Sequence, residues 1–361
     1  MSALSAPRTA VPRRIGPYAV VTRLDGDRFG PTGPPVPENR FIARSADGER
    51  TVLIGVPRAG ADHARFAAEA ETSRYLLGPW SAPATETSAP GASPAEVPWH
   101  ARPYVPALPL PTALTVHGGP LPERTVRALG AALVETLAIL HGQGLTHAGL
   151  SPAAVLLAAD GPRLTCFGAV RAAAPDGEPR SGLPGLEPGS LPPEQAAGER
   201  PHPMGDIYAL GAVLAYAATG HTVPERDELP TTLRAPITAC LSRDPASRPQ
   251  AAALLKEFTG GGREHRGGPP VTVVDGEADA GRAARLLVAG WLPGRVIAAI
   301  ARQSAAVLAA EIPADARADA AADAAATKRE PGAPVETVID SGPATVVLAA
   351  PTHRERARTD R

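Results

Sequence analysis

The first hundred residues alternate short apolar runs with polar turns, a pattern that is typical of β-strands. Strands are expected over residues 18–24 and on both sides of 46–49, where Ala-Asp-Gly-Glu predicts a hairpin turn. One helix, over about 61–77, interrupts these strands. The residues toward one side of it are Phe66, Ala70, Tyr75 and Leu76.

After this helix, the chain is expected to form a loop, one more strand and a connector. Residues 78–96 are rich in Pro, Ala and Ser and predict a surface loop. A further strand is expected within 99–106 (WHARPYVP), and a Pro-rich connector follows near 106–111. The β-rich part of the chain therefore ends close to residue 108.

Beyond the connector, the apolar residues recur with the period of a helix. Residues 122–142 start with Pro122 at the first helical position and carry apolar side chains at spacings of three and four, namely Val126, Leu129, Leu133, Leu137 and Leu140. Residues 206–220 are apolar on nearly all faces, which indicates a helix buried in a core. Helical segments continue to about 258, where a Gly/Arg-rich stretch ends the domain.

The most apolar late stretch, 285–312, is not expected to span a membrane. A spanning helix needs about 20 nearly uncharged residues, and this stretch contains Arg295, Arg302 and a central Pro293. Two helices are predicted there instead. The start of the chain lacks the apolar region of a signal peptide.

Composition narrows the possible functions. With 361 residues, the chain can hold a two-lobed domain of about 250 residues plus tails. A formal charge of −1 gives no basic footprint for nucleic acid.

Two cysteines, Cys166 and Cys240, cannot form a disulfide framework, so a cytoplasmic location is expected. The only lysines are Lys256 and Lys328, and the only asparagine is Asn39, which excludes mechanisms that need either residue elsewhere.

A series of motifs in one order resembles the eukaryotic-like Ser/Thr protein kinases of bacteria, over about residues 14–258. RTVLIGV (50–56) stands where the family has Val-Ala-x-Lys, and Glu69 matches the acidic residue of its N-lobe helix. THAGLSPAAVLL (146–157) aligns with His-Arg-Asp-Leu-Lys-Pro-x-Asn-Val-Leu-Leu, and CFG (166–168) with Asp-Phe-Gly. PPEQ (192–195) matches the Pro-Glu motif that closes the activation segment.

The resemblance implies an α+β, bilobal protein-kinase-like fold with a β-rich N-lobe and a helical C-lobe. Its expected parts are a disordered leader (1–13), the N-lobe (14–108), the C-lobe (109–258), a linker (259–280), a helical extension (281–312) and a low-complexity, disordered tail (313–361).

At the family's catalytic positions this chain has lost the reactive groups. Kinase catalysis positions phosphates and neutralises their charge. The strand Lys corresponds to Gly55, the general-base Asp to Gly149 and its neighbouring Lys to Ser151. The two metal ligands correspond to Ala154 and Cys166, and thiols are poor ligands for Mg²⁺. In the Gly-rich loop, which ends at Gly30, Asp25 and Asp27 replace glycines and would repel a triphosphate; an ordinary hairpin with acidic tips fits equally well.

The residues that the family uses to hold its fold are retained. By resemblance, Glu194 and Arg248 form a buried ion pair, and Asp206 holds the catalytic-loop backbone from the same helix as Gly211. His147, Phe167 and Gly168 support backbone shape and packing, with His147 also expected to form hydrogen bonds. Having lost its lysine, Glu69 is expected to face solvent or to pair with an arginine.

Neither Cys166 nor the serines of the activation segment are expected to form a functional site. Cys166 is expected to be a half-buried, inert thiol, because no basic residue adjoins it in sequence. The activation segment offers only Ser181 and Ser190, and the arginine that would receive a phosphate there is Ala148. Activation-loop phosphorylation of the family's kind is therefore not expected.

The tail contains two near-repeats, PVTVVDG (270–276) and PVETVIDSG (334–342). Both hold Thr-x-x-Asp, at Thr272 and Thr337, which as phosphothreonines would resemble ligands of forkhead-associated domains. The alternative is that both are short β-prone edges that pair with each other or with the domain.

These observations predict a pseudokinase that binds neither ATP nor Mg²⁺ appreciably and that acts as a scaffold or regulatory partner, of an active kinase or of a forkhead-associated protein. Two alternatives remain. One is a kinase-family enzyme with weak or unconventional ATP-dependent transfer, a label that would rest on homology alone. The other is a small-molecule sensor that uses the vacated nucleotide cleft.

Overall fold

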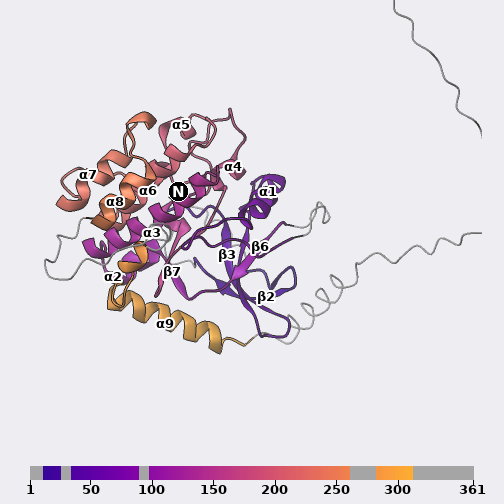
Figure 1. Ribbon diagram of the computed structural model, residues 1–361. Helices are drawn as coiled ribbons and strands as arrows, with labels where there is room; N and C mark the ends of the chain where they lie inside the picture. Colours follow the sequence, from indigo (N-terminus) through magenta and orange to yellow (C-terminus); the bar gives the residue numbers. More distant parts are fainter. Residues whose placement is uncertain (1–10, 26–33, 89–96, 261–281, 312–361) are drawn as a thin grey trace, which may run out of the picture.

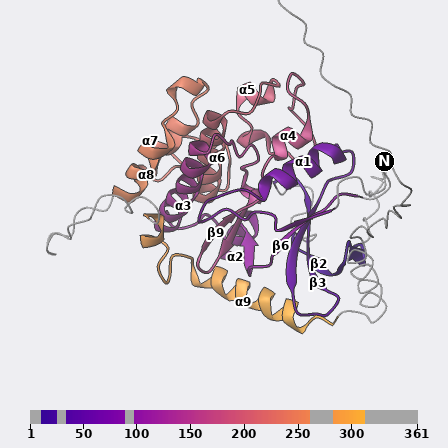
Figure 2. The ribbon, with the colours of Figure 1, turned by 45° about the vertical axis from the view of Figure 1, so that its right-hand side comes forward.

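The computed structural model describes residues 11–25, 34–88, 97–260 and 282–311, and it has two lobes (Figure 1). A curled β-sheet forms one lobe, and helices packed around two long central helices form the other (Figures 1 and 2). The predicted α+β, bilobal protein-kinase-like fold is confirmed. The expected leader up to residue 10, most of the linker and nearly all of the tail lie outside the described residues, and so do Asp27, Gly30, Thr272 and Thr337.

The N-lobe sheet has six strands in the order β1-β2-β3-β4-β6-β5, and every pair in it is antiparallel. The strands are β1 (Arg14–Ile15), β2 (Tyr18–Arg23), β3 (Asn39–Ser45), β4 (Thr51–Val56), β5 (Glu86–Thr87) and β6 (His100–Pro103). The hairpin predicted around residues 46–49 is confirmed, because it joins β3 to β4. This hairpin and β6 place Gly55 between Arg40 and His100.

The predicted N-lobe helix is present but shorter than its apolar pattern indicated. Helix α1 covers His63–Ser73, and the side chain of Asp62 caps its N-terminus by accepting from the Arg65 amide. The chain leaves the helix after Ser73, so that Leu76 is buried while Tyr75 is 71% exposed. The prediction that Tyr75 and Leu76 lie toward the same side of the helix was therefore wrong.

The segment between α1 and β6 is more than a surface loop. Trp80 packs over Gly161 and donates a hydrogen bond from Nε1 to Glu135, 3.0 Å away. Farther along, β5 adds an edge strand to the sheet. The predicted Pro-rich connector forms strand β7 (Ala107–Pro109), which pairs with the C-lobe strand β8 (Val155–Ala158). The expected boundary at residue 108 thus falls within a strand that belongs to the C-lobe sheet.

The C-lobe is built around helices α3 and α6. Its helices are α2 (Leu110–His117), α3 (Glu123–Gly142), α4 (Ala169–Ala173), α5 (Pro193–Ala196), α6 (Pro203–Thr219), α7 (Thr231–Cys240) and α8 (Ala251–Gly260), and strand β9 (Gly161–Leu164) completes a three-stranded sheet. Pro122 lies at the N-cap of α3, one position before the predicted one, and α6 begins at Pro203 because His202 caps it.

Both central helices are buried, as their apolar patterns predicted. Leu129, Leu133 and Leu137 of α3 and Leu210 and Val213 of α6 are fully inaccessible to solvent. Among the described helices, α3 alone has the length and composition to cross a membrane, and 72% of its apolar 18-residue stretch is buried inside the fold. Burial of this kind is expected of a core helix.

Within its described residues, 282–311, the C-terminal extension contains one α-helix rather than the predicted two. Helix α9 covers Gly294–Ala309 with Pro293 as its N-cap, and the residues before it form only a 3₁₀ turn at Ala283–Arg285. Gly290 adopts a positive φ of 85°, which directs Trp291 and Leu292 into the C-lobe core. This turn and Pro293 end any helix that the apolar run could have continued.

Helix α9 contacts α2 and β7 of the C-lobe and β3 of the N-lobe, and it runs along the shared edge of the lobes (Figure 1). At the C-lobe end, Trp291 donates from Nε1 to the Ala159 carbonyl, 2.9 Å away, and its own carbonyl accepts from the Thr125 hydroxyl. At the N-lobe end, Arg44 of β3 donates to the carbonyls of Val307, Leu308 and Ala310. The extension therefore fastens the two lobes to each other.

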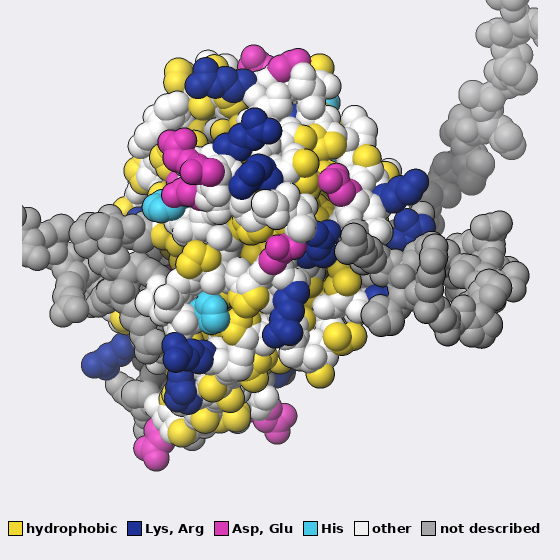
Figure 3. All heavy atoms as spheres, turned by 90° about the vertical axis from the view of Figure 1, so that its left-hand side faces the viewer, with side chains coloured by type: hydrophobic (Ala, Val, Ile, Leu, Met, Phe, Trp, Pro, Cys, Tyr) yellow, Lys and Arg dark blue, Asp and Glu magenta, His cyan; other side chains and the backbone are white. Residues whose placement is uncertain are grey.

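The face viewed from the left of Figure 1, on the side of α7 and α8, carries charges of both signs (Figure 3). Basic and acidic side chains lie interspersed among apolar and uncharged ones on this face (Figure 3). A large patch of a single sign is not visible there, in keeping with the near-zero formal charge of the sequence.

Candidate functional site

The segment from His147 to Ala154 lies at the interface of the lobes, and Asp206 of α6 holds it there. The Asp206 carboxylate accepts from the backbone amides of His147, at 2.7 Å, and Ala148, at 2.9 Å, as the resemblance implied. It also accepts from His141 Nε2 at 2.9 Å. Ala148 has a φ of 51°, a conformation that costs a non-glycine residue about 1 kcal/mol or more.

The position of the family's catalytic base has no room for a side chain. A Cβ atom added to Gly149 would lie 1.9 Å from the Cys166 carbonyl oxygen and 3.1 Å from Ala169. The catalytic-loop backbone thus lies directly against the turn that follows β9. The neighbouring Ser151 is buried, and its hydroxyl has no hydrogen-bond partner among the described residues. Ala154 is fully buried, with its carbonyl accepting from Thr165.

The position of the phosphate-binding lysine is closed in the same way. A Cβ atom at Gly55 would lie 2.4 Å from the imidazole ring of His100 and 2.6 Å from a carboxylate oxygen of Glu38. His100 faces Gly55 across the β4–β6 pair, so both positions project to the same side of the sheet. The imidazole therefore takes the volume in which a lysine side chain would begin.

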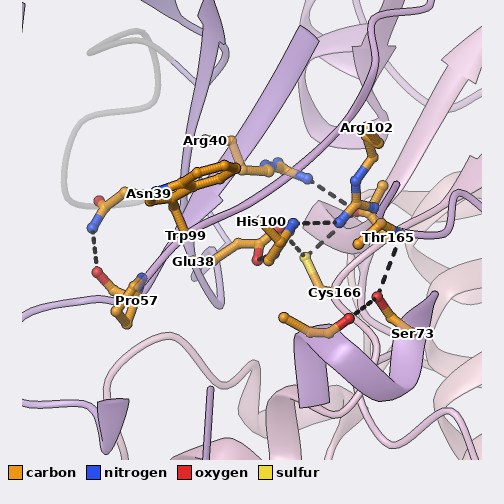
Figure 4. Close-up of polar contacts among 12 residues, drawn as sticks. Glu38, Asn39, Arg40, Pro57, Ser73, Trp99, His100, Arg102, Thr165 and Cys166 are labelled. Carbon is orange, nitrogen blue, oxygen red and sulfur yellow. Dashed lines mark hydrogen bonds and ion pairs between the residues drawn. The ribbon is translucent and has the colours of Figure 1, made fainter. Parts of the chain in front are cut away.

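His100 connects a buried carboxylate to a buried guanidinium (Figure 4). Its Nε2 lies 2.7 Å from Glu38, and its Nδ1 accepts from Arg102 at 3.0 Å, which assigns the ring proton to Nε2. Burial alone would raise the pKa of Glu38, but His100, Arg102 and Arg40 hold it at about 2. Burial lowers the pKa of Arg102, and Glu38 only partly offsets this effect.

A second buried guanidinium crosses the space between the lobes. Arg40 of β3 forms an ion pair with Asp25, and it donates to the Ala153 carbonyl at 2.8 Å and to the Thr165 hydroxyl at 3.3 Å. Burial would lower the pKa of Arg40, but the facing Asp25 carboxylate outweighs it and raises the pKa. Asp25 therefore neutralises an internal cation instead of standing free at the tip of a loop.

Beside the connector, the two lobes pack directly on each other through apolar side chains. Leu24, Ile42 and Leu53 from the underside of the N-lobe sheet join Leu156 and Ala158 of β8 in one buried cluster. Val307 of α9 and Ala107 of β7 complete this cluster. Arg40 and the cluster together fill the central and connector-side parts of the space between the lobes.

Cys166, at the family's metal-binding position, is fully buried rather than half-buried, at 4% exposure. Its thiol lies 3.6 Å from Glu38 and 3.4 Å from the Thr165 hydroxyl. Burial and the Glu38 carboxylate raise the pKa of the thiol to about 12, even though Arg40 and Arg102 lie nearby in space. A protonated thiol is a poor nucleophile and a poor metal ligand, which agrees with the prediction that Cys166 is inert.

Glu69 pairs with an arginine, as predicted. Arg171 of α4 donates from Nε and Nη2 to the two carboxylate oxygens of Glu69, both at 2.7 Å. The same guanidinium donates to the Thr146 carbonyl and lies over the Phe167 ring, 4.9 Å from its centroid. Gly168 is required here, because a Cβ atom at that position would meet the Glu69 carboxylate.

The predicted ion pair between Glu194 and Arg248 is present. The two Arg248 terminal nitrogens lie 2.5 and 2.9 Å from the Glu194 oxygens, and the guanidinium also donates to the carbonyls of Ser242 and Met204. Gly211 lets α6 pack against Cys240, 2.6 Å from where its Cβ atom would lie.

His147 packs against Phe167, as expected. Its ring stands edge-on to Phe167, with the centroids 5.7 Å apart. Neither ring nitrogen has a partner among the described residues. Burial lowers the pKa of His147 to about 4, so the ring is neutral. The hydrogen bonds of this residue come from its backbone instead.

The described part of the chain contains no group of three or more His, Cys, Asp and Glu side chains arranged to hold a metal ion. In the activation segment, Ser181 is exposed and Ser190 is buried. Ala148 carries no charge that could receive a phosphate there.

Four residues of this site were missed in the sequence: Glu38, Arg40, His100 and Arg102. Charged residues in or next to short strands are usually solvent-facing, so none of them drew attention. A signal was nevertheless present. His100 and Arg102 are two residues apart and therefore share a face of their strand, next to the position that lost its lysine.

Comparison with known proteins identifies relatives of this chain. It is 35% identical over 269 residues to the probable serine/threonine-protein kinase PkwA of Thermomonospora curvata, covering 69% of this chain and 34% of PkwA. It is 31% identical over 311 residues to the serine/threonine-protein kinase AfsK of Streptomyces coelicolor, covering 80% of this chain and 35% of AfsK. The chain thus spans about a third of the length of these relatives. No family model matches it.

Among solved structures, the crystal structure of the PknI kinase domain of Mycobacterium tuberculosis is similar. The TM-score is 0.51 with 20% sequence identity, over 70% of this chain and 99% of that domain. This likeness concerns the fold. By sequence and by fold, the chain is a homologue of the bacterial Ser/Thr protein kinases.

Proposed function

We propose that this domain is a pseudokinase, which binds a protein partner and transfers no phosphate. It keeps the kinase fold and the contacts that stabilise it, while its interior is organised around internal ion pairs instead of a nucleotide. Its role would be that of a scaffold or regulatory partner.

One observation carries this proposal: the positions of the phosphate-binding lysine and of the catalytic base are both glycines with no room for a side chain. The volume at Gly55 is taken by His100 and Glu38, and that at Gly149 by the Cys166 carbonyl. A loss of side chains alone would leave an open site, in which neighbouring residues could replace the missing groups. Here the surrounding structure has closed on both positions.

The described residues do not fit ATP and Mg²⁺. Arg40 and Asp25 cross the centre of the space between the lobes, and the cluster of Leu53 and Leu156 closes its connector side. Mg²⁺ needs hard oxygen ligands in near-octahedral geometry. At the two metal-ligand positions the chain offers a methyl group and a protonated thiol, and the nearest carboxylate, Glu38, is bound to His100.

An ATP-dependent transferase is the alternative that the named relatives favour, since PkwA and AfsK are both called serine/threonine-protein kinases. It would require Arg40 and Asp25 to separate and the lobes to part at the apolar cluster. Helix α9 opposes that movement, because it is fastened to both lobes through Arg44 and Trp291.

The proposed partner is a protein, either an active kinase or a forkhead-associated domain that reads phosphorylated Thr272 or Thr337. Both threonines lie outside the described residues, so this docking mode rests on the sequence alone. The two buried, unpaired cysteines support a proposed cytoplasmic location.

A phosphotransfer assay tests the proposal. The purified chain is incubated with γ-labelled ATP, a generic protein substrate, and Mg²⁺ or Mn²⁺. The expected result is no incorporation, into the chain or the substrate, above a blank that lacks the chain. Incorporation that follows the chain through gel filtration, depends on the metal and disappears in the Glu69→Gln variant would establish the transferase instead.

A further inference from the structure

A cavity of about 150 Å³ lies next to the closed nucleotide positions, between α1 and the turn that follows β9. Phe66 and Ala70 of α1 line one side, and Phe167 lines another. The activation segment closes the front at Leu183 and Leu186, and the exposed loop at residues 59–60 borders the opening. An apolar cavity of this volume is large enough for one six-membered ring.

The lining of the cavity is mostly apolar, but its inner end is polar. His100, Arg102 and Cys166 meet there (Figure 4). His100 stacks on Phe66, with ring centroids 5.4 Å apart and an angle of 24° between the planes. A flat apolar body therefore fits beside these rings, and the basic residues of the lining can pair with a polar group on it, as in small-molecule sites generally.

The charges around the cavity favour an anion. Its two acidic lining residues are already engaged, Glu38 by His100 and Glu69 by both arms of Arg171. The two basic lining residues are less satisfied. Among the described residues, Arg58 donates only to the Val36 carbonyl and has no carboxylate within ion-pair distance. Arg102 donates to His100, which lies between it and Glu38, and the Arg102 Nε has no partner among the described residues.

We infer that this cavity binds a small organic acid, consisting of a carboxylate on an apolar body about the size of one aromatic ring. The ring lies among Phe66, Ala70 and Phe167, and the carboxylate pairs with Arg58 at the opening. The inference rests on the proposed binding role of the domain and supplies its ligand class. It also changes where a small-molecule sensor site would lie, because the cavity is beside the nucleotide positions and not in them.

Thermal unfolding in the presence of benzoate tests this inference on the full chain. Benzoate is expected to raise the melting temperature saturably, by about 2–4 °C at ten times its Kd. Benzyl alcohol has the same ring without the charge, and inorganic phosphate has charge without the ring. Benzyl alcohol is expected to give less than half of the benzoate shift, and phosphate none.

Two variants and one control locate the effect. Ala70→Leu fills the cavity from α1, and Arg58→Gln removes the cation at its opening; each is expected to abolish most of the benzoate shift. Arg65→Gln, whose side chain pairs with Asp62 outside the cavity, is expected to keep the full shift. The melting temperature of each variant without ligand shows whether it folds.

Four results would overturn the inference: no benzoate shift in the unaltered chain, an undiminished shift in Ala70→Leu, an undiminished shift in Arg58→Gln, or a shift by benzyl alcohol or phosphate equal to that by benzoate. An ATP titration in the same assay keeps the two proposals separate. A metal-dependent ATP shift would contradict the pseudokinase assignment without bearing on benzoate, and the absence of a benzoate shift would leave that assignment intact.

Discussion

Gly55 and His100 are cross-strand neighbours, and the imidazole of His100 stands where any side chain at position 55 would begin. Glu38 holds the ring in this place from one side and Arg102 from the other. A lysine cannot be restored at position 55 without displacing this buried group. The network of His100, Glu38 and Arg102 thus fills the space that a lysine side chain at position 55 would need.

The same argument makes Gly149 sensitive to the smallest substitution. Because a methyl group at Gly149 would overlap the Cys166 carbonyl, Gly149→Ala is expected to lower the free energy of unfolding by about 1–3 kcal/mol. Gly142→Ala is the matched control, since nothing lies within 4 Å of a Cβ atom there. Urea unfolding of both variants measures the difference. Equal stabilities would show that position 149 is open.

The ion pair between Glu194 and Arg248 should contribute strongly to stability. Arg248→Met leaves the Glu194 carboxylate unpaired in a mostly buried place, which typically costs about 3–5 kcal/mol. Breaking the exposed pair of Arg74 and Glu71 with Arg74→Gln is expected to cost less than about 1 kcal/mol. Denaturant midpoints compare the two variants, and a similar loss in both would contradict the structural role of Arg248.

Which parts of this site the sequence could predict depends on how each residue is held. The contacts of Asp206 and Glu194 followed from motifs at fixed spacing, and the structure confirms both. For Glu69 the sequence left two outcomes open, exposure to solvent or an arginine partner, and the structure shows the second, with Arg171. The group of His100 and Arg40 has no such motif. Its residues come from separate strands, and only the register of β3, β4 and β6 brings them together.

The fold was predictable where periodicity was strong and less so at the ends of elements. The long runs of α3 and α6 were predicted within a few residues. The late apolar run gave one helix instead of two, because Gly290 and Pro293 break it and Trp291 packs inward. The apolar side chains there serve tertiary packing, which periodicity alone does not distinguish from a helix face.

Burial of His147 predicts how stability depends on pH. Its pKa is about 4 in the folded chain and about 6.5 when unfolded, so between these values only the unfolded state binds the proton. Stability is therefore expected to fall as the pH drops from 6.5 to 4, by about 3 kcal/mol.

The variant His147→Phe should flatten that part of the pH profile, since the ring nitrogens have no partners to lose among the described residues. His63→Gln alters an exposed histidine and should leave the profile unchanged. Urea unfolding between pH 4 and 7 measures both. An unchanged slope in His147→Phe would show that other groups cause the pH dependence.

The contact of α9 with the N-lobe should stabilise the joined lobes. Val307 is 3% exposed in the cluster between the lobes, whereas its neighbour Leu308 is 72% exposed. Val307→Ala is expected to cost about 1–3 kcal/mol and to speed amide hydrogen exchange in β3, while Leu308→Ala should do neither. Equal exchange rates in the two variants would mean that α9 does not fasten the lobes.

The measurement that tests the central claim most directly is a thermal-unfolding titration of the chain with ATP, with and without Mg²⁺ or Mn²⁺. With the lysine position filled by His100 and the centre crossed by Arg40 and Asp25, no change in melting temperature is expected at millimolar ATP. A saturable, metal-dependent rise in melting temperature would contradict the account and reopen the space between the lobes as a nucleotide site.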